Sequence, residues 1–95
     1  MGIIVQKYGG SSVATTEHIN AVAERIKRAH GSGLGLVVTV SAMGKQTDRL
    51  LRLAGEVSRD PSPREIDQLL STGELQSVAL LELRVGRPCI RRRRR

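Results

Sequence analysis

Two short runs of aliphatic and β-branched residues, separated by one amphipathic helix, restrict the possible folds of this chain more than any other feature. The runs cover residues 3–5 and 34–40. Between them, apolar residues recur at the spacing of one helix face, at Ile19, Val22, Ala23 and Ile26. Thr15 or Thr16 caps the start of this helix, and Gly31 follows its end. Strand, helix and strand in this order predict a βαβ unit with parallel strands.

Neither run alternates apolar with polar residues, which is typical of strands inside an α/β sheet. We therefore expect the first strand to be buried and the second to be covered on both faces. The loop after the second strand, residues 41–46, would lie at the carboxyl edge of the sheet, where open α/β sheets bind ligands. The predicted fold class is α/β.

The rest of the chain is expected to be helical. A first stripe consists of Leu50, Leu53, Ala54 and Val57. After a linker over residues 60–63, Ser62 and Glu65 have capping-box spacing with Pro63 between them, which predicts a new helix. We expect residues 71–74 to interrupt this helix and a further helix to follow. From Arg84 onward no periodic pattern remains.

The charge of the chain divides it into a neutral body and a basic tail. The formal net charge is +7 for 95 residues, but residues 1–83 hold nine basic and nine acidic side chains. The excess therefore lies at Arg84, Arg87 and residues 91–95. We expect one domain over residues 1–83, which is a size that buries one modest core, and an Arg-rich tail over residues 84–95.

Two interpretations of the tail stay open. In one, a small α/β remnant binds RNA, DNA or an acidic partner through these arginines, although a chain with one Tyr, no Trp and no Phe offers no aromatic platform for bases. In the other, the mixture of Arg with Gly, Pro and Cys arises from a GC-rich gene read out of frame. The nucleotide sequence around this segment would distinguish them.

Several classes of protein are excluded by single features. Cys89 is the only cysteine, so an internal disulfide and a multi-cysteine zinc site are ruled out. His18 and His30 have no metal-ligand set around them and are expected at the surface. No segment approaches the ~20 apolar residues of a membrane span, and residues 1–6 lack the pattern of a secretion signal, so we expect none. We expect a cytoplasmic protein without a membrane partner.

Three glycine-containing segments invite comparison with nucleotide-binding motifs. Residues 30–35 resemble a dinucleotide fingerprint but follow a helix and precede a strand, which is the wrong order. Residues 44–47 lack the upstream glycine of a Walker A loop. Residues 7–12 stand after a strand and before a helix, where glycine amides and a lysine can bind phosphate. Spacing alone leaves open phosphate binding and a tight strand-to-helix turn.

Residues 7–14, with the sequence Lys-Tyr-Gly-Gly-Ser-Ser-Val-Ala, resemble the opening signature of the aspartokinases, which are members of the amino acid kinase family. Two further blocks match in order, at residues 40–48 and 64–74. The similarity extends over residues 1–81. The resemblance implies the amino-terminal part of the amino acid kinase fold, whose complete form is a mostly parallel sheet between helix layers.

The resemblance also implies an activity. Aspartokinases transfer phosphate from ATP to the side-chain carboxylate of L-aspartate, which is the first step toward lysine, threonine, methionine and, in bacteria, diaminopimelate. ATP is then the co-substrate and Mg²⁺ accompanies it. After residue 81 the family's nucleotide-binding half is missing from this chain. We expect no appreciable kinase activity from it alone, and either a homo-oligomer or a complementary kinase chain as partner.

Roles for individual residues follow from the same resemblance. Lys7 matches the lysine between the nucleotide phosphates and the attacking carboxylate, where a positive charge offsets the repulsion of two anions. Gly9 and Gly10 would offer amides to phosphate, and Ser12 a hydroxyl beside them. Tyr8 fills the family's aromatic position and is expected to pack rather than react.

Three other residues match positions that hold the amino acid substrate in the family: Ser41, Thr47 and Glu74. An ionised glutamate suits an α-ammonium group, and hydroxyls and loop amides suit carboxylates. From the residues alone, the alternatives are a loop serine, a helix N-cap threonine and a glutamate in the first turn of a helix. Capping and substrate binding can also coexist.

Overall fold

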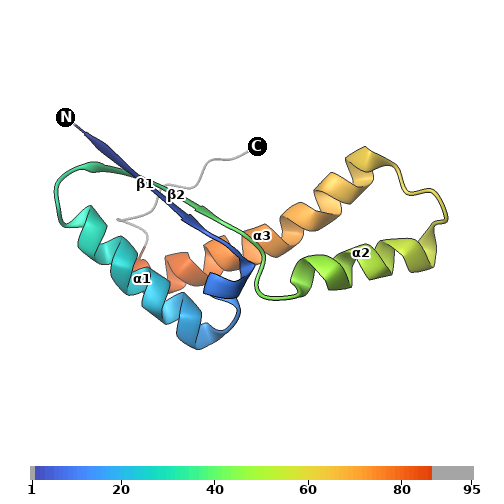
Figure 1. Ribbon diagram of the computed structural model, residues 1–95, viewed down its shortest axis with the longest axis horizontal. Coiled ribbons are helices and arrows are strands. Elements are labelled where there is room, and N and C mark those ends of the chain that lie inside the picture. Colours follow the sequence, from blue (N-terminus) through green and yellow to red (C-terminus); the bar gives the residue numbers. More distant parts are fainter. Residues whose placement is uncertain (1, 87–95) are drawn as a thin grey trace.

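The computed structural model describes residues 2–86 and confirms the βαβ unit (Figure 1). The elements in chain order are β1 (Ile3–Tyr8), the 3-10 turn η1 (Gly10–Val13), α1 (Thr16–His30), β2 (Gly35–Val40), α2 (Gln46–Val57) and α3 (Pro63–Val85). β1 and β2 pair in parallel, with Ile3 opposite Gly35 and Tyr8 opposite Val40. The α/β fold class is therefore correct. Most of the expected Arg-rich tail lies outside the described residues, including Arg87, Cys89 and residues 91–95.

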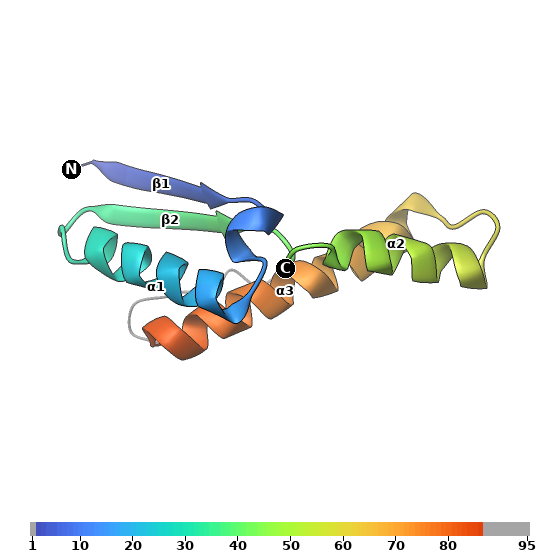
Figure 2. The ribbon, with the colours of Figure 1, turned by 60° about the horizontal axis from the view of Figure 1, so that its bottom comes forward.

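The described part of the molecule is elongated, with dimensions of 49 × 27 × 19 Å. α1 and the second half of α3 lie on the same face of the sheet, whereas α2 and the first half of α3 form a hairpin that projects beyond its carboxyl edge (Figure 2). The core lies between the sheet, α1 and α3, and its buried members are Tyr8, Val13, Ile19, Val22, Ala23, Ile26, Leu81 and Val85. Tyr8 packs in this core, as expected.

The expectation that both strands are buried is wrong. Ile3 is 69% exposed, Val5 63% and Val37 48%, because helices cover only one face of the sheet in the described part of the chain. Side chains alternate between the two faces of a strand, so every second residue of β1 and β2 turns to the open face. The apolar runs therefore supply one face of the core and leave an apolar face uncovered.

The expected interruption at residues 71–74 is also wrong, since α3 continues through them as one helix of 23 residues. The hydroxyl groups that suggested a break bond back to their own helix: Ser71 Oγ donates to Gln68 O at 2.8 Å, and Thr72 Oγ1 donates to Leu69 O at 2.7 Å. Gly73 is retained inside the helix by close packing, described below. At its other end α3 extends past Arg84 to Val85, which joins the core.

The helix starts are largely as predicted. Thr15 caps α1, its hydroxyl accepting from His18 N at 3.2 Å, and Ser62 caps α3, its hydroxyl accepting from Glu65 N at 3.3 Å.

The apolar stripe expected for α2 is only half correct. Leu50 and Ala54 are buried against α3, but Leu53 is 43% exposed and Val57 87%, because a single helix packs against α2 and covers a narrow strip of it.

Candidate functional site

The two loops expected to form the site begin side by side because β1 and β2 end at the same level. Lys7 lies opposite Thr39 and Tyr8 opposite Val40. The ladder continues one step further, where Ser41 N donates to Tyr8 O at 3.0 Å. Residues 9–13 and 41–45 therefore leave the sheet together at its carboxyl edge, which is where α/β sheets form ligand sites.

Gly10 lets these two loops touch. Gly44 N donates to Gly10 O at 3.1 Å, and a Cβ built on Gly10 would lie 3.2 Å from the carbonyl oxygens of Ala42 and Gly44. Backbone atoms cannot easily move away from such a contact, so any larger residue would separate the loops. Gly44 itself has φ +50, a conformation that favours glycine. Gly9 differs, because nothing lies within 4 Å of a Cβ placed there.

α3 is held against the loop after β2 by two small residues four positions apart. A Cβ on Gly73 would lie 2.9 Å from Ala42 Cβ and 3.2 Å from Gln46 Cγ. One turn later the fully buried Ser77 donates its hydroxyl to Ser41 O at 2.7 Å. Sequence reasoning missed both positioning residues, although small residues at i and i+4 in a helix are a recognisable pattern for close packing.

Ser77→Ala is expected to destabilise the fold by ~1–2 kcal/mol relative to Ser71→Ala, because only the first substitution removes a hydrogen bond between two elements. Both replacements gain the same small helix propensity of ~0.5 kcal/mol, so their difference isolates the bond from Ser77 to Ser41. Urea unfolding followed by circular dichroism measures it. Equal midpoints for the two variants would contradict the expectation.

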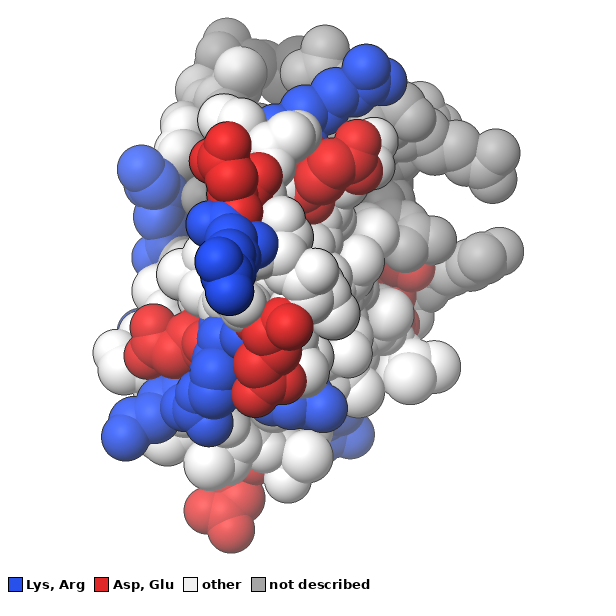
Figure 3. All heavy atoms as spheres, turned by 90° about the vertical axis from the view of Figure 1, so that its right-hand side faces the viewer, with Lys and Arg blue, Asp and Glu red and all other residues white. Residues whose placement is uncertain are grey.

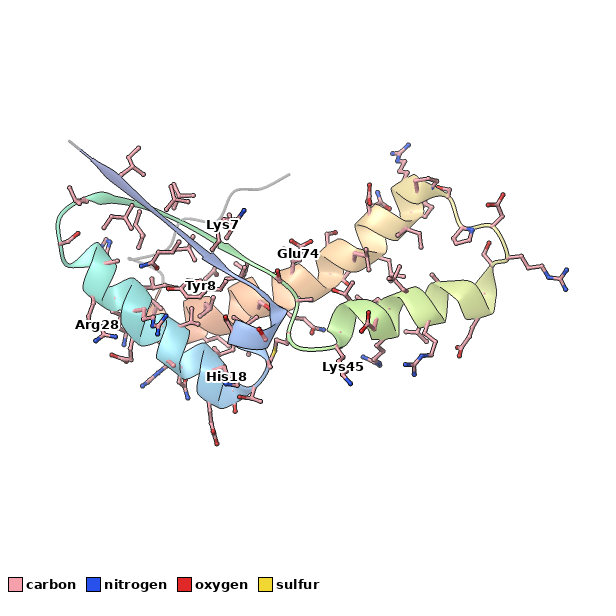
Figure 4. The ribbon with its side chains drawn as sticks, viewed as in Figure 1. Lys7, Tyr8, His18, Arg28, Lys45 and Glu74 are labelled. Atoms are coloured by element: carbon pink, nitrogen blue, oxygen red, sulfur yellow. The ribbon has the colours of Figure 1, made fainter. Side chains whose placement is uncertain are left out.

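Lys7 and Glu74 reach this edge from different elements. Lys7 is the second-last residue of β1 and lies on the open face of the sheet, and Glu74 lies in the middle of α3 next to Gly73; both residues are exposed. Figure 4 shows them pointing to the same side of the molecule, with Lys45 and His18 on the opposite side. Among the described residues, neither side chain has a hydrogen-bond or ion-pair partner. A cation and a carboxylate are thus both available to a ligand.

The alternative roles considered for two substrate-position residues are wrong. The N-cap of α2 is Lys45, and Thr47 lies exposed in the first turn, so it does not cap the helix. Glu74 does not begin a helix, since α3 starts at Pro63. Ser41 is a loop residue, as expected, and Ser12 is exposed in η1 with its amide bonded to Gly9 O at 3.0 Å. Among residues 2–86, no hydrogen bond joins Thr47 to the other candidate residues.

The remaining observations on the described residues concern the two histidines, metal ligands, membrane spans and surface charge. His18 and His30 are exposed, as predicted. Within residues 2–86 no group of three or more His, Cys, Asp and Glu side chains is placed to hold a metal ion. None of the helices in that range is both long and apolar enough to cross a membrane. At the outer end of the α2–α3 hairpin, basic and acidic side chains are interspersed rather than separated (Figure 3).

Comparison with known proteins gives the same family as the sequence motifs. The protein-family model described as "Amino acid kinase family" matches residues 2–87 of this chain. An aspartokinase of Geobacillus stearothermophilus is 55% identical over 83 residues, which are 87% of this chain and 20% of that protein. One from Mycolicibacterium smegmatis is 54% identical over 85 residues, or 90% of this chain and 20% of the relative.

A solved structure gives the same result. The crystal structure of an aspartate kinase from Synechocystis matches with a TM-score of 0.83 and 58% identity, over 88% of this chain and 14% of that one. The chain thus spans about a fifth of the length of the curated relatives it matches. The resemblance drawn from the three motifs is confirmed: this chain belongs to the amino acid kinase family.

Proposed function

We propose that this chain carries the aspartate-binding side, and part of the phosphate-binding side, of an aspartate kinase, which converts ATP and L-aspartate to ADP and 4-phospho-L-aspartate. The observation that carries the proposal is the meeting of three family motifs at one sheet edge: the loop after β1, the loop after β2, and α3 around Glu74. They are far apart in sequence, and a binding site requires them to be close.

Lys7 is the proposed catalytic residue. Phosphoryl transfer to a carboxylate brings two anions together, and negative charge spreads over the transferred group in the transition state. A lysine fixed at the end of a strand, next to loop amides, offsets that charge without forming a covalent intermediate. Gly9, Gly10 and Ser12 are the proposed phosphate-binding residues of the same loop.

Ser41, Thr47 and Glu74 are the proposed aspartate-binding residues. The carboxylate of Glu74 suits the α-ammonium group, and the hydroxyls of Ser41 and Thr47 suit a carboxylate of the substrate. Mg²⁺ is expected to accompany ATP, but the described residues offer no ligand cluster for it, so we assign no metal ligand to this chain.

The proposal takes residues 1–83 as a partial kinase domain and residues 84–95 as an Arg-rich tail, with α3 and the family match both running a little past that boundary. A chain that matches a fifth of its relatives has no assigned residues for adenine and ribose. We therefore expect the polypeptide alone to lack appreciable kinase activity and to need a complementary kinase chain. A cytoplasmic location and a role toward lysine, threonine and methionine belong to the same proposal.

Titration with L-aspartate tests the substrate side of this proposal. In ¹H–¹⁵N spectra of the whole chain, the amide signals of Gly10, Ser41 and Thr47 are expected to shift in a saturable way. Glu74→Gln should weaken L-aspartate binding about tenfold, because a hydrogen bond to a charged group contributes ~1.5–3 kcal/mol. Glu56→Gln on α2 is the matched control and should leave the affinity unchanged.

Succinate separates the role of the ammonium group from that of the carboxylates. It lacks the α-ammonium group, so it should bind weakly and with the same affinity to the parent chain and to Glu74→Gln. Absence of saturable shifts with L-aspartate, or equal L-aspartate affinity of the parent and Glu74→Gln, would contradict the assignment.

A further inference from the structure

Both backbone polar groups of Ser41 are bonded to residues of other elements. Its amide donates to Tyr8 O at 3.0 Å, which extends the pairing of β1 and β2 by one residue. Its carbonyl oxygen accepts the hydroxyl of Ser77, on α3, at 2.7 Å. A residue bonded at both its N–H and its C=O cannot turn without breaking one of these bonds. The backbone of Ser41 is therefore fixed between a strand and a helix.

This arrangement leaves the side chain of Ser41 unused. The residue is exposed, and among residues 2–86 its hydroxyl takes part in no hydrogen bond. A serine hydroxyl can donate one hydrogen bond and accept others. The hydroxyl of Ser41 is thus free to bind a ligand, while its position is set by groups that the ligand does not touch.

Ser77 reaches the loop because α3 comes unusually close to it one turn earlier. A Cβ on Gly73 would lie 2.9 Å from the Cβ of Ala42, the residue after Ser41. Ser77 is 0% exposed, and no buried side-chain nitrogen or oxygen in the described part of the chain lacks a partner. A buried hydroxyl without a partner is costly, and water does not reach this one. The bond from Ser77 to Ser41 is therefore maintained in the folded chain.

Glu74 lies on α3 between these two contacts. It follows Gly73 directly and precedes Ser77 by three residues, on the part of α3 that contacts the loop after β2 (Figure 4). Residues three apart on a helix are neighbours, with Cβ atoms ~5–6 Å apart. The bond at Ser77 therefore fixes the loop of Ser41 to the same helix turn that carries the Glu74 carboxylate.

We propose that Ser77 is a positioning residue for substrate binding, which keeps the hydroxyl of Ser41 and the carboxylate of Glu74 at the separation that one molecule of L-aspartate spans. This inference rests on the proposed function, which assigns both groups to the substrate. Ser77 is fully buried and does not touch the substrate itself. Two groups that bind one ligand together give a higher affinity when their separation is fixed beforehand, because less ordering remains for the binding step.

A purely structural role for Ser77 predicts a different result. Loss of a structural bond loosens the loop and weakens its contacts with the substrate, whether or not Glu74 also binds. Loss of a positioning bond matters only while Glu74 holds the other end of the same molecule. A double-mutant cycle of Ser77→Ala and Glu74→Gln separates the two roles.

Titration of the whole chain with L-aspartate, followed in ¹H–¹⁵N spectra, measures this cycle. Ser77→Ala should weaken L-aspartate binding about tenfold in the parent chain, but less than about twofold in a chain that already carries Glu74→Gln. Ser77→Cys is a second variant of nearly the same size, with only a weak donor in place of the hydroxyl, and should follow Ser77→Ala in both backgrounds.

Two controls distinguish positioning from general effects. Ser71→Ala removes a hydroxyl that bonds within its own helix, to Gln68 O at 2.8 Å, and should leave the affinity unchanged. Ile26→Val removes one methylene group from a core residue that is 2% exposed. It lowers the stability without altering the site, so it should also leave the affinity unchanged.

The outcomes separate this proposal from the proposed function. Equal affinity of the parent and Ser77→Ala, or an equal loss of affinity in the parent and Glu74→Gln backgrounds, would overturn the role of Ser77 and leave the aspartate assignment intact. A loss of affinity in Ile26→Val as large as that in Ser77→Ala would also overturn it. Absence of saturable binding to the parent chain would overturn both.

Discussion

Gly73→Val is expected to lower the free energy of unfolding by about 3 kcal/mol, the upper range for overpacking a tight contact. A Cβ at this position already comes within 2.9 Å of Ala42 Cβ, 3.2 Å of Gln46 Cγ and 3.4 Å of Leu50 Cδ1. Ala42 is 3% exposed, and its side chain is a single methyl group that can move only with the backbone of the loop. The added methyl groups of valine would force α3 away from the loop after β2.

Gly55→Val is the matched control for this substitution. Gly55 lies inside α2, and nothing is found within 4 Å of a Cβ placed there. Valine forms helix somewhat better than glycine, so Gly55→Val should change the stability by less than about 0.5 kcal/mol. Urea unfolding of both variants gives the comparison. Similar midpoints would show that Gly73 does not hold α3 against the loop.

The second large effect is expected at Lys7. In a kinase assembly completed by the missing part of an aspartokinase, Lys7→Met should lower the rate of acyl phosphate formation by about 10²–10³-fold, the usual effect of removing one group that stabilises transition-state charge. Methionine keeps an unbranched side chain of similar length and removes the ammonium group, with its charge and its hydrogen-bond donors. Lys27→Met, on the far flank of α1 beside Glu24, is the control and should change the rate less than twofold.

The parts of the fold that depend on local sequence were predictable. The βαβ order, the caps at Thr15 and Ser62, and the apolar stripe of α1 each follow from residues a few positions apart. These features are governed by backbone hydrogen bonding and by the period of a single helix. Neighbours far away in sequence have little influence on them.

The errors arose where distant segments decide the outcome. The apolar runs of β1 and β2 suggested burial on both faces, but burial depends on which elements pack there, and α1 and α3 cover only one. Gly73 suggested a break because glycine weakens helices, yet it is tolerated in α3 because Ala42 occupies the space that a side chain would need.

The candidate site was predictable as a set of motifs but not as a geometry. The loop of Gly9 and Gly10 follows a strand and precedes a helix, an order visible in the sequence. That Gly10 touches Gly44, or that Ser77 bonds Ser41, depends on contacts between residues more than thirty positions apart. Only the folded chain brings these groups together.

Hydroxylamine trapping of the acyl phosphate tests the central claim most directly. With ATP, Mg²⁺ and L-aspartate, the whole chain alone is expected to form no hydroxamate above the background. Mixed with the part of the Geobacillus stearothermophilus aspartokinase that this chain does not match, it should form hydroxamate, and the Lys7→Met mixture should lose that activity. Hydroxamate formed by this chain alone, or undiminished activity of the Lys7→Met mixture, would contradict the claim that the chain is an insufficient part of an aspartate kinase whose catalytic lysine is Lys7.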